Sequence, residues 1–228
     1  MAYSLSIIIP VCNESGIIND TIDRLDRLIQ ENPVECIVVD GSPAGETITA
    51  VKNKKIIRAT SGKGRGCQMN RGASIARGSI LLFLHADTML PSGALEHIDA
   101  VMRDERYVGG AFDLSIASKK PLLRLVAKVA SLRSRITRIP YGDQALFARR
   151  DFFHSMGGFR DIPIMEDVDF MRRLKARKGR IHITHMKVRT SSRRWEKEGI
   201  IYGTLRNWTL MILYLFGMSP EKLARFYR

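Results

Sequence analysis

Short apolar runs alternate with helical patterns through the first half of the chain. The apolar runs lie at Leu5 to Val11, Cys36 to Val39 and Ile80 to Leu84, with a shorter one at Lys55 to Ala59. Unbroken runs of this length are typical of parallel strands that are buried on both faces. We therefore predict a sheet whose centre is formed by the first and last of these strands.

Helical periodicity fills the intervals between the predicted strands. Ile17 to Ile29 repeats apolar residues every three or four positions, which predicts a helix packed on the sheet. Further helices are predicted at Gly66 to Ala76 and Gly93 to Arg103. This alternation predicts an α/β, Rossmann-like domain with a mainly parallel central sheet flanked by helices. A chain of 228 residues suits one such domain with an appendage.

The second half begins with a strand near Val108 to Leu114 and a basic amphipathic helix from Leu122 to about Arg138, beyond which the pattern predicts no clear topology. Two interpretations of the amphipathic helix stay open. Its apolar stripe packs on the sheet or on a partner subunit, or it docks on an anionic membrane. The stripe consists of Leu122, Leu125, Val126, Val129, Leu132 and Ile136, and the charges around it are Arg124, Lys128, Arg133, Arg135 and Arg138.

The C-terminal region, residues 191–228, is predicted to be a helical extension of a main domain at residues 1–190. The apolar stretch Ile200 to Gly217 is interrupted by Arg206 and Asn207, so it falls short of the ~20 residues that span a bilayer. Its aromatic residues, such as Trp208, favour a membrane interface. We expect the extension to pack on the domain, on a second copy of the chain or on a membrane surface.

The charge balance predicts an anionic partner. The chain has 37 Lys and Arg against 23 Asp and Glu, a formal net charge of +14. Nucleic acid, an anionic membrane and phosphorylated ligands all fit this excess. Cys12, Cys36 and Cys67 lack CxxC spacing and no export signal is recognisable, so we expect free thiols and a cytoplasmic protein, with membrane association on the cytoplasmic face.

Polar residues follow the predicted strands at their C-terminal ends, where open α/β sheets bind ligands. Pro10, Asn13 and Glu14 follow the first strand, and Asp40 follows the second. Each also has a purely structural interpretation, because Asn13 would cap the next helix and Asp40 would close an Asx-turn.

A glycine-rich segment, Ser61 to Gly66, precedes the predicted helix at Gly66 to Ala76. It has neither Walker A spacing nor a complete G-x-G-x-x-G fingerprint. Lys63, Arg65 and Arg71 nevertheless favour an anion at that helix N-terminus.

After the Ile80 to Leu84 strand come His85 and Asp87. One carboxylate is enough to hold a hard cation whose other ligands are diphosphate oxygens and water. His85 is either a second ligand or a hydrogen-bonded structural residue.

Further acids lie later in the chain, at Asp143 beside Gln144 and at Glu166, Asp167 and Asp169. The last three would be favoured at a solvated helix N-terminus. Alternatively, a partly desolvated carboxylate among them would act as a general base toward a hydroxyl.

In this order, the motifs are similar to those of the inverting family 2 glycosyltransferases with a GT-A fold, and more narrowly to a short bacterial-type subgroup. The resemblance covers nearly the whole chain. It is carried by Ile8 to Glu14, Val38 to Gly41, Gly66 to Asn70 with Gly72, Leu84 to Thr88, Gly142 to Gln144, Gly157 to Phe159 and Met165 to Asp167.

The resemblance implies a role for each motif. Its first two motifs would hold the nucleoside, which gives this role to Pro10, Asn13, Glu14 and Asp40. Arg65 and Asn70 would lie along nucleotide and phosphate. Asp87 would be the Mn²⁺ or Mg²⁺ ligand, with His85 where the family carries the first acid of Asp-X-Asp, and Asp167 would be the general base with Glu166 beside it.

The chain departs from the processive members of that family, which carry Gln-X-X-Arg-Trp. Here Ser191 to Trp195 keeps Arg194 and Trp195 but has no Gln, which favours transfer of a single sugar. Asp143 and Gln144 would orient donor or acceptor, and Arg193 or Arg194 would stabilise the departing diphosphate.

The sequence therefore predicts a hexosyl-type transferase that uses a nucleotide-diphosphate sugar and a hydroxyl acceptor, lipid-like if the membrane interpretation holds. A nucleotidyltransferase of similar fold and a basic nucleic-acid-binding protein are the alternatives. The second is disfavoured because no nucleic-acid reading motif is present and the acids concentrate at strand ends.

Overall fold

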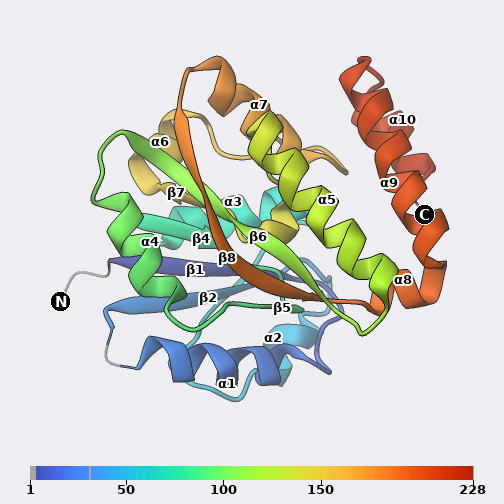
Figure 1. Cartoon of the computed structure of the whole chain (residues 1–228). Helices are drawn as coiled ribbons and strands as arrows, with labels where there is room; N and C mark the ends of the chain where they lie inside the picture. The colour runs from blue at the N-terminus through green and yellow to red at the C-terminus, as the bar shows by residue number, and fades with distance from the viewer. Residues whose placement is uncertain (1–3, 31, 228) are drawn as a thin grey trace.

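The computed structural model describes residues 4–30 and 32–227 as one eight-stranded sheet covered by helices (Figure 1). The strand order is β3-β2-β1-β4-β7-β6-β8-β5. The strands are β1 (Leu5–Val11), β2 (Val34–Asp40), β3 (Ile57–Thr60), β4 (Ile80–Phe83), β5 (Thr88–Met89), β6 (Tyr107–Ala117), β7 (Phe147–Arg149) and β8 (Arg180–Ser191). The helices are α1 (Ile18–Ile29), α2 (Glu46–Ala50), α3 (Arg65–Ile75), α4 (Ala94–Met102), α5 (Pro121–Thr137), α6 (Arg150–Ser155), α7 (Glu166–Ala176), α8 (Arg193–Glu198), α9 (Ile200–Leu215) and α10 (Pro220–Arg225).

The first four strands form the parallel half of the sheet, as predicted. β1 pairs with β2 and β4, and β2 pairs with β3, all in parallel. Ile7, Ile8 and Ile9 have no exposed surface because helices cover both faces of β1. On one face they pack with α1, α4 and α5, and on the other with α3, α6 and α7. All four strands therefore end at the same edge of the sheet.

The second half of the sheet is mixed, so the predicted mainly parallel character holds strictly only for the first half. β7 pairs antiparallel with both β4 and β6, and β5 pairs antiparallel with β8. β6 and β8 are parallel, with register shifts at Tyr107/Gly109 and Ala111/Asp113. Such irregularities bend a strand and increase its twist, and both strands curve across the front of the molecule in Figure 1.

The apolar stripe of α5 does not pack on the sheet, which removes that interpretation for most of its residues. Leu125, Leu132 and Ile136 are 55%, 58% and 73% exposed. Val126 is the partly buried exception. The face that covers the sheet carries Leu123 and three small residues, Ala127, Ser131 and Ser134.

The C-terminal extension consists of α8, α9 and α10, and α9 contacts α5. Leu210 and Leu223 are its buried anchors. Among the described helices, none is both long enough and apolar enough to cross a membrane. The division of the chain at residue 190 stays a prediction.

Candidate active site

Three predicted site residues meet at the C-terminal edge of the parallel strands. Glu14 follows β1, Asp87 follows β4, and Arg193 begins α8 directly after β8. The Arg193 guanidinium Nη2 lies 3.5 Å from Glu14 Oε2 and 3.7 Å from Asp87 Oδ2. The fold thus joins residues 179 positions apart in sequence into one charged cluster. We call Glu14, Asp87 and Arg193 the donor cluster.

Asp40, the last residue of β2, is fully buried. Its carboxylate accepts hydrogen bonds from the Ser42 amide and hydroxyl and from the amides of Thr47 and Ile48. Although burial opposes ionisation, these hydrogen bonds hold the pKa of Asp40 below its ordinary value. In this structure Asp40 closes the turn after β2, as the Asx-turn interpretation states, and presents no free oxygen to a nucleoside.

Pro10 and Asn13 also have structural positions. Pro10 is buried in β1, where it pairs with Val39, and Asn13 is exposed with a left-handed φ of 59°. Asn13 does not cap α1, whose N-cap is Ile17. It shapes the turn that leads to Glu14.

The N-termini of α3 and α7 converge beside the cluster. The Arg65 guanidinium lies 3.8 Å from Glu166 Oε1. Gly66 allows this approach, because a Cβ there would lie 2.7 Å from the Arg160 carbonyl oxygen. Asn70 does not face outward, since its amide donates to the Phe159 carbonyl and accepts from the Phe159 amide.

Asp167 lies near His85, one of the two predicted metal ligands. Its Oδ2 accepts from the Gly142 amide at 2.6 Å. A Cβ on Gly142 would lie 3.3 Å from that oxygen and 3.2 Å from His85 Nε2, so His85 and Asp167 flank the same glycine. Burial, and secondly the charge of Arg65, lower the pKa of His85 to about 3, which keeps its imidazole neutral.

Glu166 and Asp169 have more buried positions than Asp167. Glu166 is 5% exposed, and burial together with the charge of Asp167 raises its pKa to about 7, partly offset by Arg65. Asp169 pairs with Arg160 and Arg173 and so belongs to the structure of the α7 N-terminus. Asp167 is the least buried of the three acids and the one best placed to meet a substrate.

Asp143 and Gln144, which share the 3-10 turn Gly142–Gln144, have different surroundings. Burial, followed by the charge of Asp167, raises the pKa of Asp143 to about 6, and its Oδ1 has no hydrogen-bond partner among the described residues. Gln144 is fully buried, and its amide bonds Ser134, Tyr141 and Phe112. Gln144 therefore holds the turn in place, while the buried Oδ1 of Asp143 is left without a partner among the described residues.

Two residues of this region were not predicted as site residues. Arg133 lies with its guanidinium carbon 3.2 Å from the centroid of the Tyr141 ring, and its charge acts on Asp143. Tyr227, beyond α10, lies under Arg194 at 4.3 Å and under Arg206 at 5.1 Å. No sequence signal marks either, because each reaches the site only through the packing of α5 or of the extension.

The remaining predicted residues lie in α8. Arg194 is 3.5 Å from Glu198, its i+4 neighbour, and Trp195 packs partly buried against the core. Cys12, Cys36 and Cys67 are free thiols, as predicted.

The side chains at this site could hold a divalent cation only if a bound ligand supplied further oxygen atoms. Among the described residues, no group of three or more His, Cys, Asp and Glu is arranged to hold a metal. The Asp87 side chain is 31% exposed, and one carboxylate suffices when phosphate oxygens supply further hard ligands.

The sheet, with its acids at the edge of the parallel strands, defines an α/β transferase fold of the GT-A type. Residues 6–161 match the model described as Glycosyl transferase family 2. Because this match covers more than half of the chain, the protein belongs to glycosyl transferase family 2.

Relatives and solved structures agree with this assignment. The chain is 29% identical over 195 residues to a PGL/p-HBAD biosynthesis glycosyltransferase of Mycobacterium bovis, covering 74% of this chain and 68% of that protein. The Mycobacterium tuberculosis protein of the same name gives the same values. In structure, the chain is similar to a mannosyltransferase from Pyrobaculum calidifontis in complex with GDP-Man and Mn²⁺. Its TM-score is 0.66 at 18% identity, over 97% of this chain and 67% of the other.

Proposed function

We propose that this family 2 glycosyltransferase moves a single sugar from a nucleotide-diphosphate sugar to a hydroxyl acceptor, with inversion and with help from a divalent cation. The observation that carries the proposal is the contact of Arg193 with both Glu14 and Asp87, with Asp167 flanking Gly142 beside His85. To these residues we assign cation binding by Asp87, diphosphate binding by Arg193 and proton abstraction by Asp167. The structural neighbour binds GDP-Man and Mn²⁺, which supports a donor of this class.

The donor end would be held by charge. Asp87 would hold the cation, and a bound Mn²⁺ or Mg²⁺ would neutralise charge on the leaving diphosphate. Arg193 is 54% exposed and would exchange its loose contacts with Glu14 and Asp87 for charge-assisted hydrogen bonds to phosphate. Glu14 would then be released to accept from a nucleoside hydroxyl.

The acceptor end would be activated by Asp167. Its carboxylate takes the proton of the acceptor hydroxyl, and the oxygen attacks the anomeric carbon opposite the diphosphate. The anomeric C–O bond breaks and its electron pair leaves with the diphosphate oxygen. A single displacement of this kind inverts the anomeric configuration. The free Oδ1 of Asp143 would orient the donor or the acceptor.

A product assay tests this function against the nucleotidyltransferase alternative. We expect nucleoside diphosphate, with no pyrophosphate, when a panel of UDP, GDP, CDP and dTDP sugars is incubated with Mn²⁺ and hydroxyl acceptors. The NMR coupling constant of the new glycosidic proton should report inversion. Pyrophosphate as the product, or retention at the anomeric carbon, would contradict the proposal.

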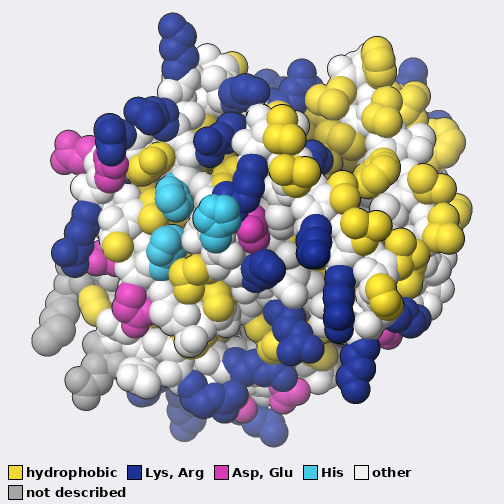
Figure 2. Space-filling model, viewed as in Figure 1, with side chains coloured by type: hydrophobic (Ala, Val, Ile, Leu, Met, Phe, Trp, Pro, Cys, Tyr) yellow, Lys and Arg dark blue, Asp and Glu magenta, His cyan; other side chains and the backbone are white. Residues whose placement is uncertain are grey.

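We further propose that the acceptor is lipid-like and is met at an anionic membrane. Within the described residues, every large exposed hydrophobic side chain lies on α5, on α9 or directly after α9 and α10, and Figure 2 shows them gathered over that face. We call this surface the apolar face. It consists of Leu122, Leu125, Val129, Leu132, Ile136, Ile201, Tyr202, Leu205, Trp208, Ile212, Leu215, Phe216 and Phe226.

Charge favours a membrane over a second copy of the chain as the occupant of the apolar face. Neither α5 nor α9 contains an acidic residue, and α5 carries four basic ones. A twofold dimer through this face would set the cations of α5 against those of its copy. An anionic bilayer offers the complementary charge together with an apolar interior.

A further inference from the structure

A concave site lies away from the donor cluster, because none of Glu14, Asp87 and Arg193 lines it. It is a cavity of about 460 Å³ formed where the ends of α5 and α7 meet the first residues of β8, with Tyr107 of β6 at one side. This volume is within the range of small-molecule sites. The length of α7 separates the cavity from Glu166, because ten residues at 1.5 Å each place the far end of the helix about 15 Å from Glu166.

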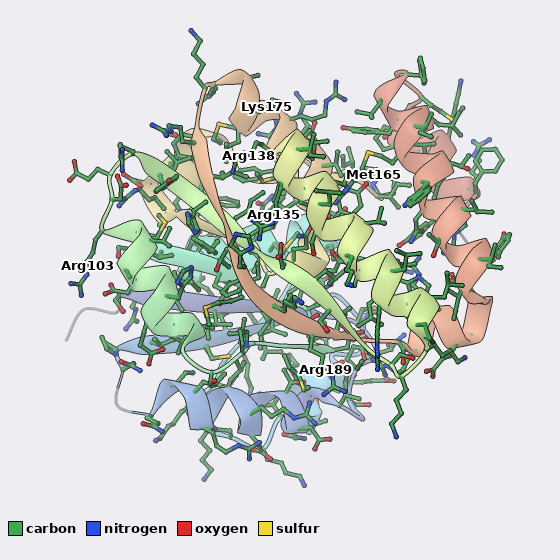
Figure 3. The ribbon with its side chains drawn as sticks, viewed as in Figure 1. Arg103, Arg135, Arg138, Met165, Lys175 and Arg189 are labelled. Carbon is green, nitrogen blue, oxygen red and sulfur yellow. The ribbon has the colours of Figure 1, made fainter. Side chains whose placement is uncertain are left out.

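The lining of this cavity is strongly cationic. Five of the lining residues are Arg135, Arg138, Lys175, Lys178 and Arg180, and no acid lines the cavity. Figure 3 places the labelled side chains of Arg135, Arg138 and Lys175 around the crossing of α5, α7 and β8. We call these five residues the basic pocket.

Only one of the five charges is neutralised in the described part of the chain. Arg135 pairs with Asp113 at 2.8 Å and also donates to the carbonyls of Ile183 and Thr184. Lys175 donates to the Thr137 carbonyl, and none of the other four forms an ion pair with a described acid. Four like charges on a concave wall repel one another unless an anion joins them.

The backbone adds an independent observation. Arg138 and Lys178 both adopt left-handed φ angles, 59° and 57°, at the ends of their helices. Glycine is the usual residue in this position, because a side chain there is strained. The chain thus places two cations, at the cost of strain, where glycine would end both helices without it. Helix dipoles favour cations near these ends but do not account for Arg180, which begins β8.

We propose that the basic pocket binds the phosphate group of a ligand distinct from the sugar donor. Arg138, Lys178 and Arg180 would supply the charge, and Arg135, held by Asp113, would supply a fixed wall. The ligand is either a free phosphorylated molecule or the headgroup of an anionic lipid, since both present the same group.

His182 provides a reporter inside the pocket. It lines the cavity, and its pKa is lowered by burial and then by the charges of His97, Arg138 and Arg135. Figure 2 shows histidine side chains among Lys and Arg on this face. A bound anion would offset those charges, so the His182 ring resonances should move at constant pH.

The experiment titrates the full-length protein at constant ionic strength, with EDTA present, and follows the His182 resonances by NMR. Loss of the signal in His182→Gln assigns it. One arm adds inorganic pyrophosphate and the other adds glycerol phosphate as the headgroup. We expect saturable shifts, and the tighter-binding arm identifies the source of the phosphate.

Glycine variants separate binding from structure. Arg138→Gly with Lys178→Gly removes two charges while relieving the backbone strain, so we expect an unchanged or higher melting temperature and a Kd raised at least tenfold. The matched control, Lys54→Gln with Lys55→Gln, removes two exposed charges elsewhere and should bind normally. Absence of saturable shifts in both arms, or unchanged affinity in the double glycine variant, would overturn the proposal. Asp87→Asn should bind both phosphate probes normally. Loss of donor binding can therefore be distinguished from loss of binding at the basic pocket.

Discussion

Glu166 and Asp167 are adjacent in sequence, yet their side chains have different surroundings. Glu166 is buried against Arg65, whereas Asp167 is less buried and flanks Gly142 together with His85. A general base must reach its substrate. On this ground we propose that Asp167 abstracts the proton and that Glu166 positions Arg65.

Asp167→Asn should lower kcat by on the order of 10²-fold or more while the donor Kd stays within a few-fold, because the base acts mainly in the transition state. The asparagine can still accept from the Gly142 amide, so the turn should persist. Single-turnover kinetics with donor-binding calorimetry would measure both. A collapse of donor affinity would instead place Asp167 in the donor-binding set.

Glu166 should make the stability of the fold depend on pH. Its folded pKa of about 7 lies above its ordinary value of 4.5, so the fold favours the protonated acid. Its contribution is fully present below about pH 4.5 and is lost as the pH rises to about 7. We expect the free energy of unfolding of the wild type, relative to Glu166→Gln, to fall by about 1–3 kcal/mol across that window.

Urea unfolding at pH 4.5, 6 and 7.5 measures this difference, with Glu46→Gln, on an exposed site of α2, as the control. A difference that stays constant with pH would show that Glu166 has an ordinary pKa in the fold.

The sequence predicted that Glu14 and Asp87 lie at strand ends along one edge of the sheet, and the structure brings Arg193 to both. The roles of these residues stay predictions. Gln144 also has a polar side chain, but its amide forms hydrogen bonds with Ser134, Tyr141 and Phe112. Such pairing depends on partners far away in sequence, which a motif does not reveal.

At the scale of elements, α5 has its larger apolar residues on the outside. A stripe of large apolar residues normally faces the core. Here Ser131 bonds the Leu114 amide and Ser134 bonds Gln144, so small polar residues fix the inner face close to β6. The outer stripe is thereby left for another partner.

Two substitutions to alanine should separate the faces of α5. Leu123→Ala should destabilise the fold by about 2–5 kcal/mol, because Leu123 is fully buried. Leu132→Ala, at a 58% exposed position, should change stability by no more than about 0.5 kcal/mol. Chemical denaturation of both variants gives the comparison, and equal losses would mean that the outer face is covered in solution.

The elements that the sequence predicted were those with one clear pattern of apolar positions, either an unbroken run or a repeat every three or four residues. The helix at Ile17 to Ile29 and the strand at Leu5 to Val11 were predicted within a residue of their bounds. β8 was not predicted, although Ile181 and Ile183 alternate with polar residues as in a half-buried strand. α7 begins at Glu166 with three acids in its first turn, as the helix N-terminus interpretation predicts, whereas the left-handed φ of its N-cap, Met165, was not predicted.

At the scale of the whole molecule, the apolar face and the net charge of +14 predict binding to anionic vesicles. Co-sedimentation at low salt should retain the protein on phosphatidylglycerol vesicles and not on neutral ones, since each basic residue near the surface contributes about 1 kcal/mol. Leu125→Ser with Trp208→Ser should weaken binding without lowering the melting temperature. Equal vesicle binding by the double variant would contradict membrane docking through the apolar face. A wild-type dimer that the double substitution dissociates would show that the apolar face binds a second copy of the chain instead.

The proposed function requires that the donor cluster bind a nucleotide-diphosphate sugar through a cation held by Asp87. A thermal-shift panel of UDP, GDP, CDP and dTDP sugars, with Mn²⁺ or EDTA, tests this binding, because a ligand that binds only the folded state raises the melting temperature. For the wild type and the Asp99→Asn control, we expect one donor to raise the melting temperature only with Mn²⁺, and we expect Asp87→Asn to abolish the rise. A rise that survives in Asp87→Asn, or in EDTA, would contradict this requirement.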